Sequence, residues 1–178
     1  MSRLCVTLLV LGGALLLLPQ TGSAKPGYYR DPDIHGDQIV FASEGDLWIG
    51  SAQGGGARRL TTHVGSELFP KFSPDGRVIA FSGEYDGNLD VFVMDTDGGE
   101  PRRLTWHPTS DVVLGWTPDG KKVLFRSYMT EPNHTWEIYA VSASGGDPEK
   151  LPLGWAARID MDPVSGMWAF NRTSWETA

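Results

Sequence analysis

The segment of this chain that most resembles a ligand site is 86–90, Asp-Gly-Asn-Leu-Asp, in which oxygen-bearing side chains alternate with other residues as in a calcium-binding loop. A complete EF-hand loop would also need glycine at position 91 and glutamate at position 97, where Val91 and Asp97 stand. The histidines are not spaced as in HExxH or another compact zinc motif: His35, His63, His107 and His134. We therefore expect turn or surface roles for these residues, and no metal ligands.

Motifs of covalent catalysis and of cofactor binding are missing from the sequence. The chain has no Gly-x-Ser-x-Gly elbow, no phosphate loop and no pair of carboxylates spaced for acid and base roles. Its single cysteine, Cys5, lies near the start, so the rest of the chain has no thiol chemistry. We predict neither a catalytic residue nor a cofactor.

The charge of the chain argues against nucleic acid as a partner. Fifteen Lys and Arg residues stand against 22 Asp and Glu residues, which gives a net charge of −7. The basic pairs Arg58-Arg59 and Arg102-Arg103 occupy one equivalent position of a repeat. We interpret them as solvated charges on an outer strand rather than as a phosphate site.

Three fifteen-residue repeats organise the chain: 46–60, 90–104 and 137–151. Each begins with an acidic residue, continues through an aromatic residue flanked by apolar ones, reaches Gly-Gly and ends with a basic residue and leucine. A second element precedes each repeat and ends in Phe41, Phe81, Phe125 and, in a degraded copy, Phe170, with spacings of 40, 44 and 45 residues. This period is typical of propeller blades with four strands each.

The local chemistry agrees with that period. Ser73-Pro74-Asp75-Gly76 and 117–120, Thr-Pro-Asp-Gly, match a type I turn, with a hydroxyl first, proline second and glycine fourth. The short apolar runs that follow suit strands buried on both faces. Gly98-Gly99 and Gly145-Gly146 supply the positive φ needed for the next reversal.

One blade is therefore predicted to have strands near 69–72, 77–82, 90–95 and 102–105. The fold class is all-β: a β-propeller of four-stranded blades with about three and a half blades in an incomplete ring. The partial propeller domain covers 25–178, with repeats at about 28–67, 68–111, 112–157 and, incomplete, 158–178. The stretch between the second and third strands lengthens along the chain, so we expect a functional surface at these loops.

Residues 1–24 have the features of a secretory signal peptide. Arg3 precedes an apolar stretch of fifteen residues, and Gly22 and Ala24 are small residues at the positions that a signal peptidase reads. The alternative is a membrane anchor, for which fifteen residues are short of the roughly 20 that span a bilayer. We expect an exported protein, periplasmic or extracellular, with no stable membrane anchor after cleavage.

The segment Gly83-Glu84-Tyr85-Asp86-Gly87-Asn88, joined to Asp90 and continuing into 104–108, Leu-Thr-Trp-His-Pro, resembles the start of the tricorn protease family. The resemblance covers roughly 28–178. It implies a six-bladed propeller that guides or filters peptide substrates toward a serine peptidase core in later domains. None of the family's catalytic residues falls on a position of this chain.

The resemblance implies the non-catalytic propeller of an exported tricorn-like serine peptidase, with peptides or protein partners as ligands. The Ser-Pro-Asp-Gly turn is shared with TolB-like propellers and with prolyl-oligopeptidase relatives. A TolB-like protein-binding module and the propeller of a prolyl-oligopeptidase-type hydrolase therefore remain alternatives. Because an open arc of blades exposes apolar faces and strand edges, we also expect the isolated chain to self-associate.

Overall fold

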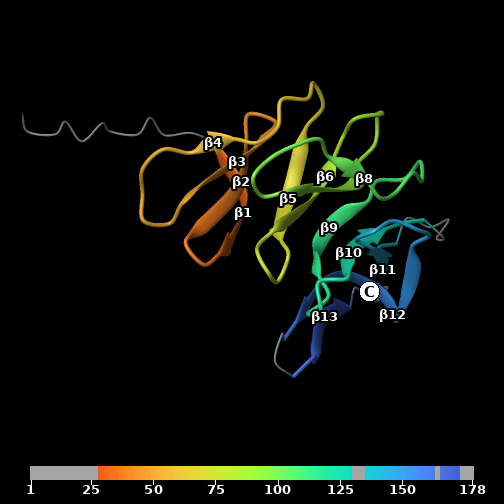
Figure 1. Cartoon of the computed structure of the whole chain (residues 1–178). Helices are drawn as coiled ribbons and strands as arrows, with labels where there is room; N and C mark the ends of the chain where they lie inside the picture. The colour runs from red at the N-terminus through yellow and green to blue at the C-terminus, as the bar shows by residue number, and fades with distance from the viewer. Residues whose placement is uncertain (1–27, 130–134, 163–164, 173–178) are drawn as a thin grey trace, which may run out of the picture.

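A computed structural model describes residues 28–129, 135–162 and 165–172, so the predicted signal peptide lies outside the described residues. Two antiparallel sheets of four strands form the first two blades, each with its strands in chain order (Figure 1). The first blade contains β1 (Tyr29–His35), β2 (Gln38–Ser43), β3 (Asp46–Ser51) and β4 (Arg58–Arg59). The second contains β5 (Glu67–Phe72), β6 (Val78–Gly83), β7 (Asp90–Asp95) and β8 (Arg102–Arg103).

The third sheet continues without a break into the next blade. It contains β9 (Val112–Trp116), β10 (Lys122–Ser127), β11 (Glu137–Ser142), β12 (Glu149–Met161) and β13 (Trp168–Arg172). The first residues of β12 pair with β11, and from Ala156 onward the same strand pairs with β13. Thus β12 is both the outer strand of the third blade and the first strand of a fourth. The predicted all-β fold of four-stranded blades is confirmed.

The predicted hairpin turns have the expected geometry. The backbone amide of Gly76 donates to the Ser73 carbonyl at 2.8 Å, and Gly76 has a φ of 71°. The Ser73 hydroxyl donates to Asp75 Oδ1 at 2.6 Å and accepts from the Val78 amide at 3.0 Å. The turn at 117–120 repeats these contacts. The side chain of the first turn residue therefore fixes the start of the following strand.

The second strand of blade 2 packs against both neighbouring blades, as predicted. In β6, Ile79 and Phe81 lie in a core shared with blade 1, whereas Ala80 lies in a core shared with blade 3. All three side chains are fully buried. Because a fully buried Phe or Ile contributes about 1.5–3 kcal/mol, these shared cores are the main adhesion between blades.

The outer strands are shorter than predicted. We expected a strand at 102–105, but β8 contains only Arg102 and Arg103. The Leu104 amide still donates to the Val91 carbonyl at 2.7 Å, whereas the Val91 amide donates to the Thr105 hydroxyl at 2.9 Å. The threonine side chain replaces a strand carbonyl there, and the chain is free to turn toward the next blade. Leu60 and Thr61 make the same contacts in blade 1.

The first strands of the blades carry irregularities that the sequence analysis did not predict. The pairing of β1 shifts between Arg30 and Asp33, and that of β5 shifts between Leu68 and Lys71. Asp31 and Phe69, each followed by proline, have φ values of 50° and 55°. These bulges bend the first strands at the same place. They also bring equivalent positions together, because Lys71 Nζ lies 3.2 Å from Asp33 Oδ1.

Candidate functional site

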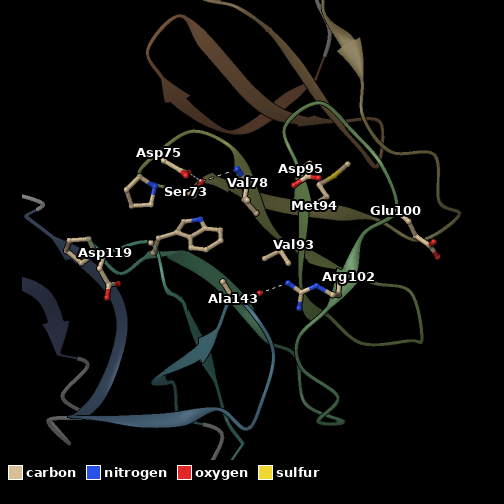
Figure 2. Close-up of a pocket in the computed structure, with 14 residues that line it drawn as sticks. Ser73, Asp75, Val78, Val93, Met94, Asp95, Glu100, Arg102, Asp119 and Ala143 are labelled. Carbon is tan, nitrogen blue, oxygen red and sulfur yellow. Dashed lines mark hydrogen bonds between the residues drawn. The ribbon is translucent and has the colours of Figure 1, made fainter.

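A cleft lies between blades 2 and 3 (Figure 2). It has a volume of about 540 Å³ and is bounded by the two equivalent turns, 73–76 and 117–120. Apolar side chains line its inner part: Val78, Val93, Met94 and Trp116. The Trp116 indole is fixed by a 3.0 Å hydrogen bond from its Nε1 to the Lys71 carbonyl. The cleft is thus part of the interface between two neighbouring blades, which we call a joint.

Negative charge dominates the rim of this cleft. The only guanidinium among the described lining residues is that of Arg102. Four carboxylates line the same cleft: Asp75, Asp95, Glu100 and Asp119. Hydrogen bonds from the Ser73 and Thr117 hydroxyls lower the pKa values of Asp75 and Asp119, so both are ionised at neutral pH. An apolar floor with an acidic rim suits the methylenes and the cation of a basic side chain.

The first arginine of each basic pair connects its blade to the next one. Arg58 donates from Nη2 to the Thr96 carbonyl at 3.3 Å, and Arg102 donates from Nη2 to the Ala143 carbonyl. Thr96 and Ala143 occupy the same position of the repeat, just after β7 and β11. Arg58 and Arg102 lie on outer strands, as we expected, but each side chain also reaches the next blade.

The second basic residue of each repeat pairs with the acid that opens the repeat. Arg59 Nη2 lies 2.5 Å from Asp46 Oδ2, and Arg103 Nη2 lies 2.6 Å from Asp90 Oδ2. Lys150 pairs with Glu137 in blade 3. All three acids are buried, so these ion pairs compensate charge inside the sheet. The charges are therefore structural rather than available for a phosphate.

A further carboxylate is buried where the chain enters blade 2. Glu67 is fully buried, and its amide donates to the Gly45 carbonyl at 2.8 Å. The Thr61 hydroxyl donates to its Oε2 at 2.7 Å, and the Tyr85 hydroxyl donates to its Oε1 at 2.9 Å. Burial raises the pKa of Glu67 and outweighs these hydrogen bonds, while burial and the Glu67 charge raise the pKa of Tyr85.

The equivalent residue at the start of blade 3 is Asp111, which is also fully buried. Its amide donates to the Leu89 carbonyl at 2.7 Å, as that of Glu67 does to Gly45. Neither carboxylate oxygen has a hydrogen bond of normal geometry to a described residue. Burial raises the pKa of Asp111 to about 6, opposed by the nearby hydroxyls of Ser127 and Thr105.

Side chains of the loop at 84–89 contact neighbouring segments of the chain. Tyr85 reaches Glu67, and Asp86 Oδ2 lies 2.5 Å from Arg103 Nη1. Asn88 Nδ2 donates to the carbonyls of His107 and Thr109, at 3.0 and 3.3 Å. The acidic oxygens of the calcium-like segment thus face an arginine. These side chains thus contact blade 2 itself and the connection that leads to blade 3, and the functional surface expected at these loops remains a prediction.

Two of the histidines have the equivalent turn roles that we expected. His63 Nδ1 accepts from the Gly65 amide at 3.0 Å, and His107 Nδ1 accepts from the Thr109 amide at 3.2 Å. His35 packs against Phe72, with ring centroids 6.0 Å apart, and His134 lies outside the described residues. In the described part of the chain, three or more His, Cys, Asp or Glu side chains nowhere gather as they would around a metal ion.

Glu67 and Asp111 were not predicted as site residues from the sequence. One signal was available, since both residues stand seven positions after a Leu of the repeat, at Leu60 and Leu104. Burial of an acid at that position could not be predicted from the residue type, because acids are rarely buried.

As for membrane insertion, none of the described segments is a helix long and apolar enough to cross a bilayer.

Comparisons with known proteins agree with the blade architecture. Residues 26–178 match the model of the tricorn protease N-terminal beta propeller domain. The tricorn protease homolog of Saccharolobus solfataricus is 34% identical over 139 residues, which are 74% of this chain but only 13% of that protein. A putative tricorn-like protease N-terminal subunit of Sulfurisphaera tokodaii is 34% identical over 136 residues, 74% of this chain and 69% of that protein.

Solved structures show the same fold. The crystal structure of the tricorn protease superposes with a TM-score of 0.72 at 27% identity, over 82% of this chain and 15% of that one. A putative TolB from Agrobacterium tumefaciens superposes with a TM-score of 0.66 at 21% identity, over 76% of this chain and 50% of that one. The predicted arc of propeller blades and the predicted family are both confirmed. The chain belongs to the family of tricorn protease N-terminal β-propeller domains.

Proposed function

We propose that this chain is the non-catalytic propeller part of an exported tricorn-like serine peptidase, and that it guides or filters peptide substrates. The observation that carries the proposal is the cleft between blades 2 and 3, with its apolar floor and acidic rim. The relative from Sulfurisphaera tokodaii supports the non-catalytic part of the proposal, since its name describes an N-terminal subunit of comparable extent.

Charge complementarity defines the peptides that should bind. The rim carries four carboxylates and one guanidinium, which already donates to the Ala143 carbonyl. A lysine or arginine side chain can lay its methylenes on the floor at Val93 and Trp116 and place its cation at the rim. Exposed charges of this kind contribute more to selectivity and association rate than to affinity. We therefore expect weak, salt-sensitive binding of basic peptides.

The test is a titration of the 178-residue chain with a short unstructured basic peptide, followed by NMR shifts at low and high salt. The double variant Asp95→Asn, Glu100→Gln neutralises half of the rim carboxylates without touching the turn hydrogen bonds of Asp75 and Asp119. It should weaken binding several-fold, whereas Asp160→Asn, an exposed control on β12, should not. Equal binding of an acidic peptide, or no response to the double variant, would overturn the proposal.

A TolB-like module that recruits folded proteins is the second candidate. It is favoured by the "Protein TolB homolog" of Chlorobium luteolum, 32% identical over 41% of this chain and 16% of that protein. The two candidates differ in what the reading frame encodes downstream. A serine peptidase region there supports the first proposal, and a stop codon soon after the propeller supports the second.

A further inference from the structure

The joint between blades 2 and 3 contains a buried acid, Asp111, whose two carboxylate oxygens have no hydrogen-bond partner among the described residues. Equivalent backbone hydrogen bonds define one position at three joints: Glu67 to Gly45, Asp111 to Leu89 and Ala156 to Trp136, with N···O distances of 2.8, 2.7 and 3.0 Å. The first two are fully buried carboxylates and the third is a buried alanine. The backbone of the joint is therefore built independently of the acid, and the acid must be explained by what surrounds it.

The groups that face Asp111 come from every element packed around it. Asp90 at the start of β7 is buried, and its Oδ2 is engaged by Arg103 of β8 at 2.6 Å. The Thr105 hydroxyl follows β8, accepts from the Val91 amide and lies 3.5 Å from Asp90 Oδ1. The Ser127 hydroxyl lies at the end of β10. The Arg103 guanidinium already pairs with Asp90 and with the exposed Asp86, so an ionised Asp111 would have no cation of its own in this buried joint.

A chain of polar groups connects this joint to the half-buried His107. Ser127 Oγ lies 3.1 Å from Thr109 Oγ1, which lies 2.8 Å from His107 Nδ1. Ser127 is itself among the side chains that act on Asp111. The joint between blades 1 and 2 is different, because Glu67 already accepts from both Thr61 and Tyr85. Polar groups therefore surround the blade 2–3 joint, but none of the described residues hydrogen-bonds the Asp111 carboxylate itself.

We propose that Asp111 holds a proton in the closed joint between blades 2 and 3, and that loss of this proton opens the joint. The Asp111 O–H bond breaks, and the proton passes to water. The remaining carboxylate then draws water into the joint, because a buried anion without partners is strongly disfavoured. The raised pKa of Asp111, about 6, agrees with this assignment but does not carry it.

Hydrogen exchange of the full chain between pH 4 and 8 tests the proposal, after correction for intrinsic exchange. The reporters are the amide of Asp111, which bonds across the blade 2–3 joint, and the amide of Glu67, which bonds across the other joint; the Leu104 and Leu60 amides, which bond within blades 2 and 1, report on the neighbouring strands. The opening constant of the Asp111 amide should rise about tenfold per pH unit between about pH 4 and pH 6, and then level off. The variant Asp111→Asn should abolish this rise and leave the reporters of the first joint unchanged.

Three results would overturn the proposal. One is a wild-type opening constant at Asp111 that does not change with pH, and this profile needs no variant to fold. Another is an unchanged profile in Asp111→Asn. The third is strong protection of the Asp111 amide at pH 7.5 by added Ca²⁺ or Na⁺ alone, which would mean that the unpartnered oxygens bind a metal cation instead of a proton.

Discussion

The joint between blades 1 and 2 and the joint between blades 2 and 3 share one backbone design but treat their buried acid differently. In the first joint, Glu67 accepts hydrogen bonds from Thr61 and Tyr85, and among the described residues only Oδ1 of Asp46 is a buried carboxylate oxygen without a partner there. In the second joint, Asp111 has two unpartnered oxygens. Repetition in this chain therefore preserves main-chain contacts and ion pairs, while the hydrogen bonding of the buried acid changes from joint to joint.

Side-chain length accounts for part of this difference. Glutamate at position 67 extends one methylene further than aspartate at position 111. The loop at 84–89 also supplies the tyrosine that meets it, since Tyr85 OH reaches Glu67 Oε1. An unsatisfied buried polar group costs about 1–3 kcal/mol, so the second joint should be the weaker one whenever Asp111 is ionised.

Removal of the satisfied acid should have the largest effect. Glu67→Ala creates a cavity and leaves the hydroxyls of Thr61 and Tyr85 without their acceptor, so the free energy of unfolding should fall by about 2–4 kcal/mol. Urea unfolding at pH 7 measures the loss. The exposed neighbour Glu84→Ala serves as the control and should change stability by about 0.5 kcal/mol or less. Similar small losses for both variants would contradict a structural role for Glu67.

Substitution of Asp111, the equivalent residue in the second joint, should change the free energy of unfolding in the opposite direction. The pKa of Asp111 is raised in the folded chain, so its contribution to stability is present at low pH and is lost as the pH rises toward about 6. Asp111→Asn should therefore raise the free energy of unfolding by about 1–3 kcal/mol at pH 7.5 and change it little at pH 4. Denaturant titrations at the two pH values measure this, and a loss at pH 7.5 would refute it.

The tyrosine that distinguishes the first joint can be tested alone. Tyr85→Phe keeps the ring against Phe92, where the centroids are 4.5 Å apart, but removes the donor to Glu67. We expect a loss of about 1–2 kcal/mol in the free energy of unfolding. In the Glu67→Ala background the same substitution should cost less, and equal losses in the two backgrounds would show that the two side chains are not coupled.

The contacts common to both joints should matter least. Arg102→Ala removes the hydrogen bond to the Ala143 carbonyl and should lower the free energy of unfolding by about 0.5–1 kcal/mol, because the side chain is exposed. Thermal unfolding can compare it with Arg77→Ala, whose guanidinium lies 4.0 Å from Asp75 and spans no joint. If both variants lose the same free energy of unfolding, the hydrogen bond from Arg102 to the Ala143 carbonyl does not stabilise the chain.

Local sequence chemistry predicted most of the fold. Ser73 and Thr117 form the expected turns, and Gly98 and Gly145 have the expected positive φ, at 105° and 98°. These features depend on a few neighbouring residues, which is why single positions reveal them. The merging of the third and fourth blades in β12 was not predicted, although Pro152 and Gly154, which has a φ of 66°, stand where the pairing changes partner.

The joints could be predicted only in part. Tyr85 and Glu67 are eighteen positions apart, and their contact depends on the pairing of β5 with β6 and on the course of the loop after β6. The Leu-Thr pair at the end of each repeat suggested a turn, but not that the Thr105 hydroxyl would accept from a strand amide. Self-association of the isolated chain and its export remain predictions.

The most direct test of the difference between the joints is a carboxyl carbon NMR titration of wild-type protein, with Asp111 and Glu67 observed in the same sample. We predict that the Asp111 carboxyl titrates near pH 6, together with the loss of protection in the blade 2–3 joint. A midpoint below about pH 4.5, within the ordinary range of an exposed aspartate, would contradict the account. Asp111 would then be an ionised carboxylate with partners, and the two joints would be equivalent.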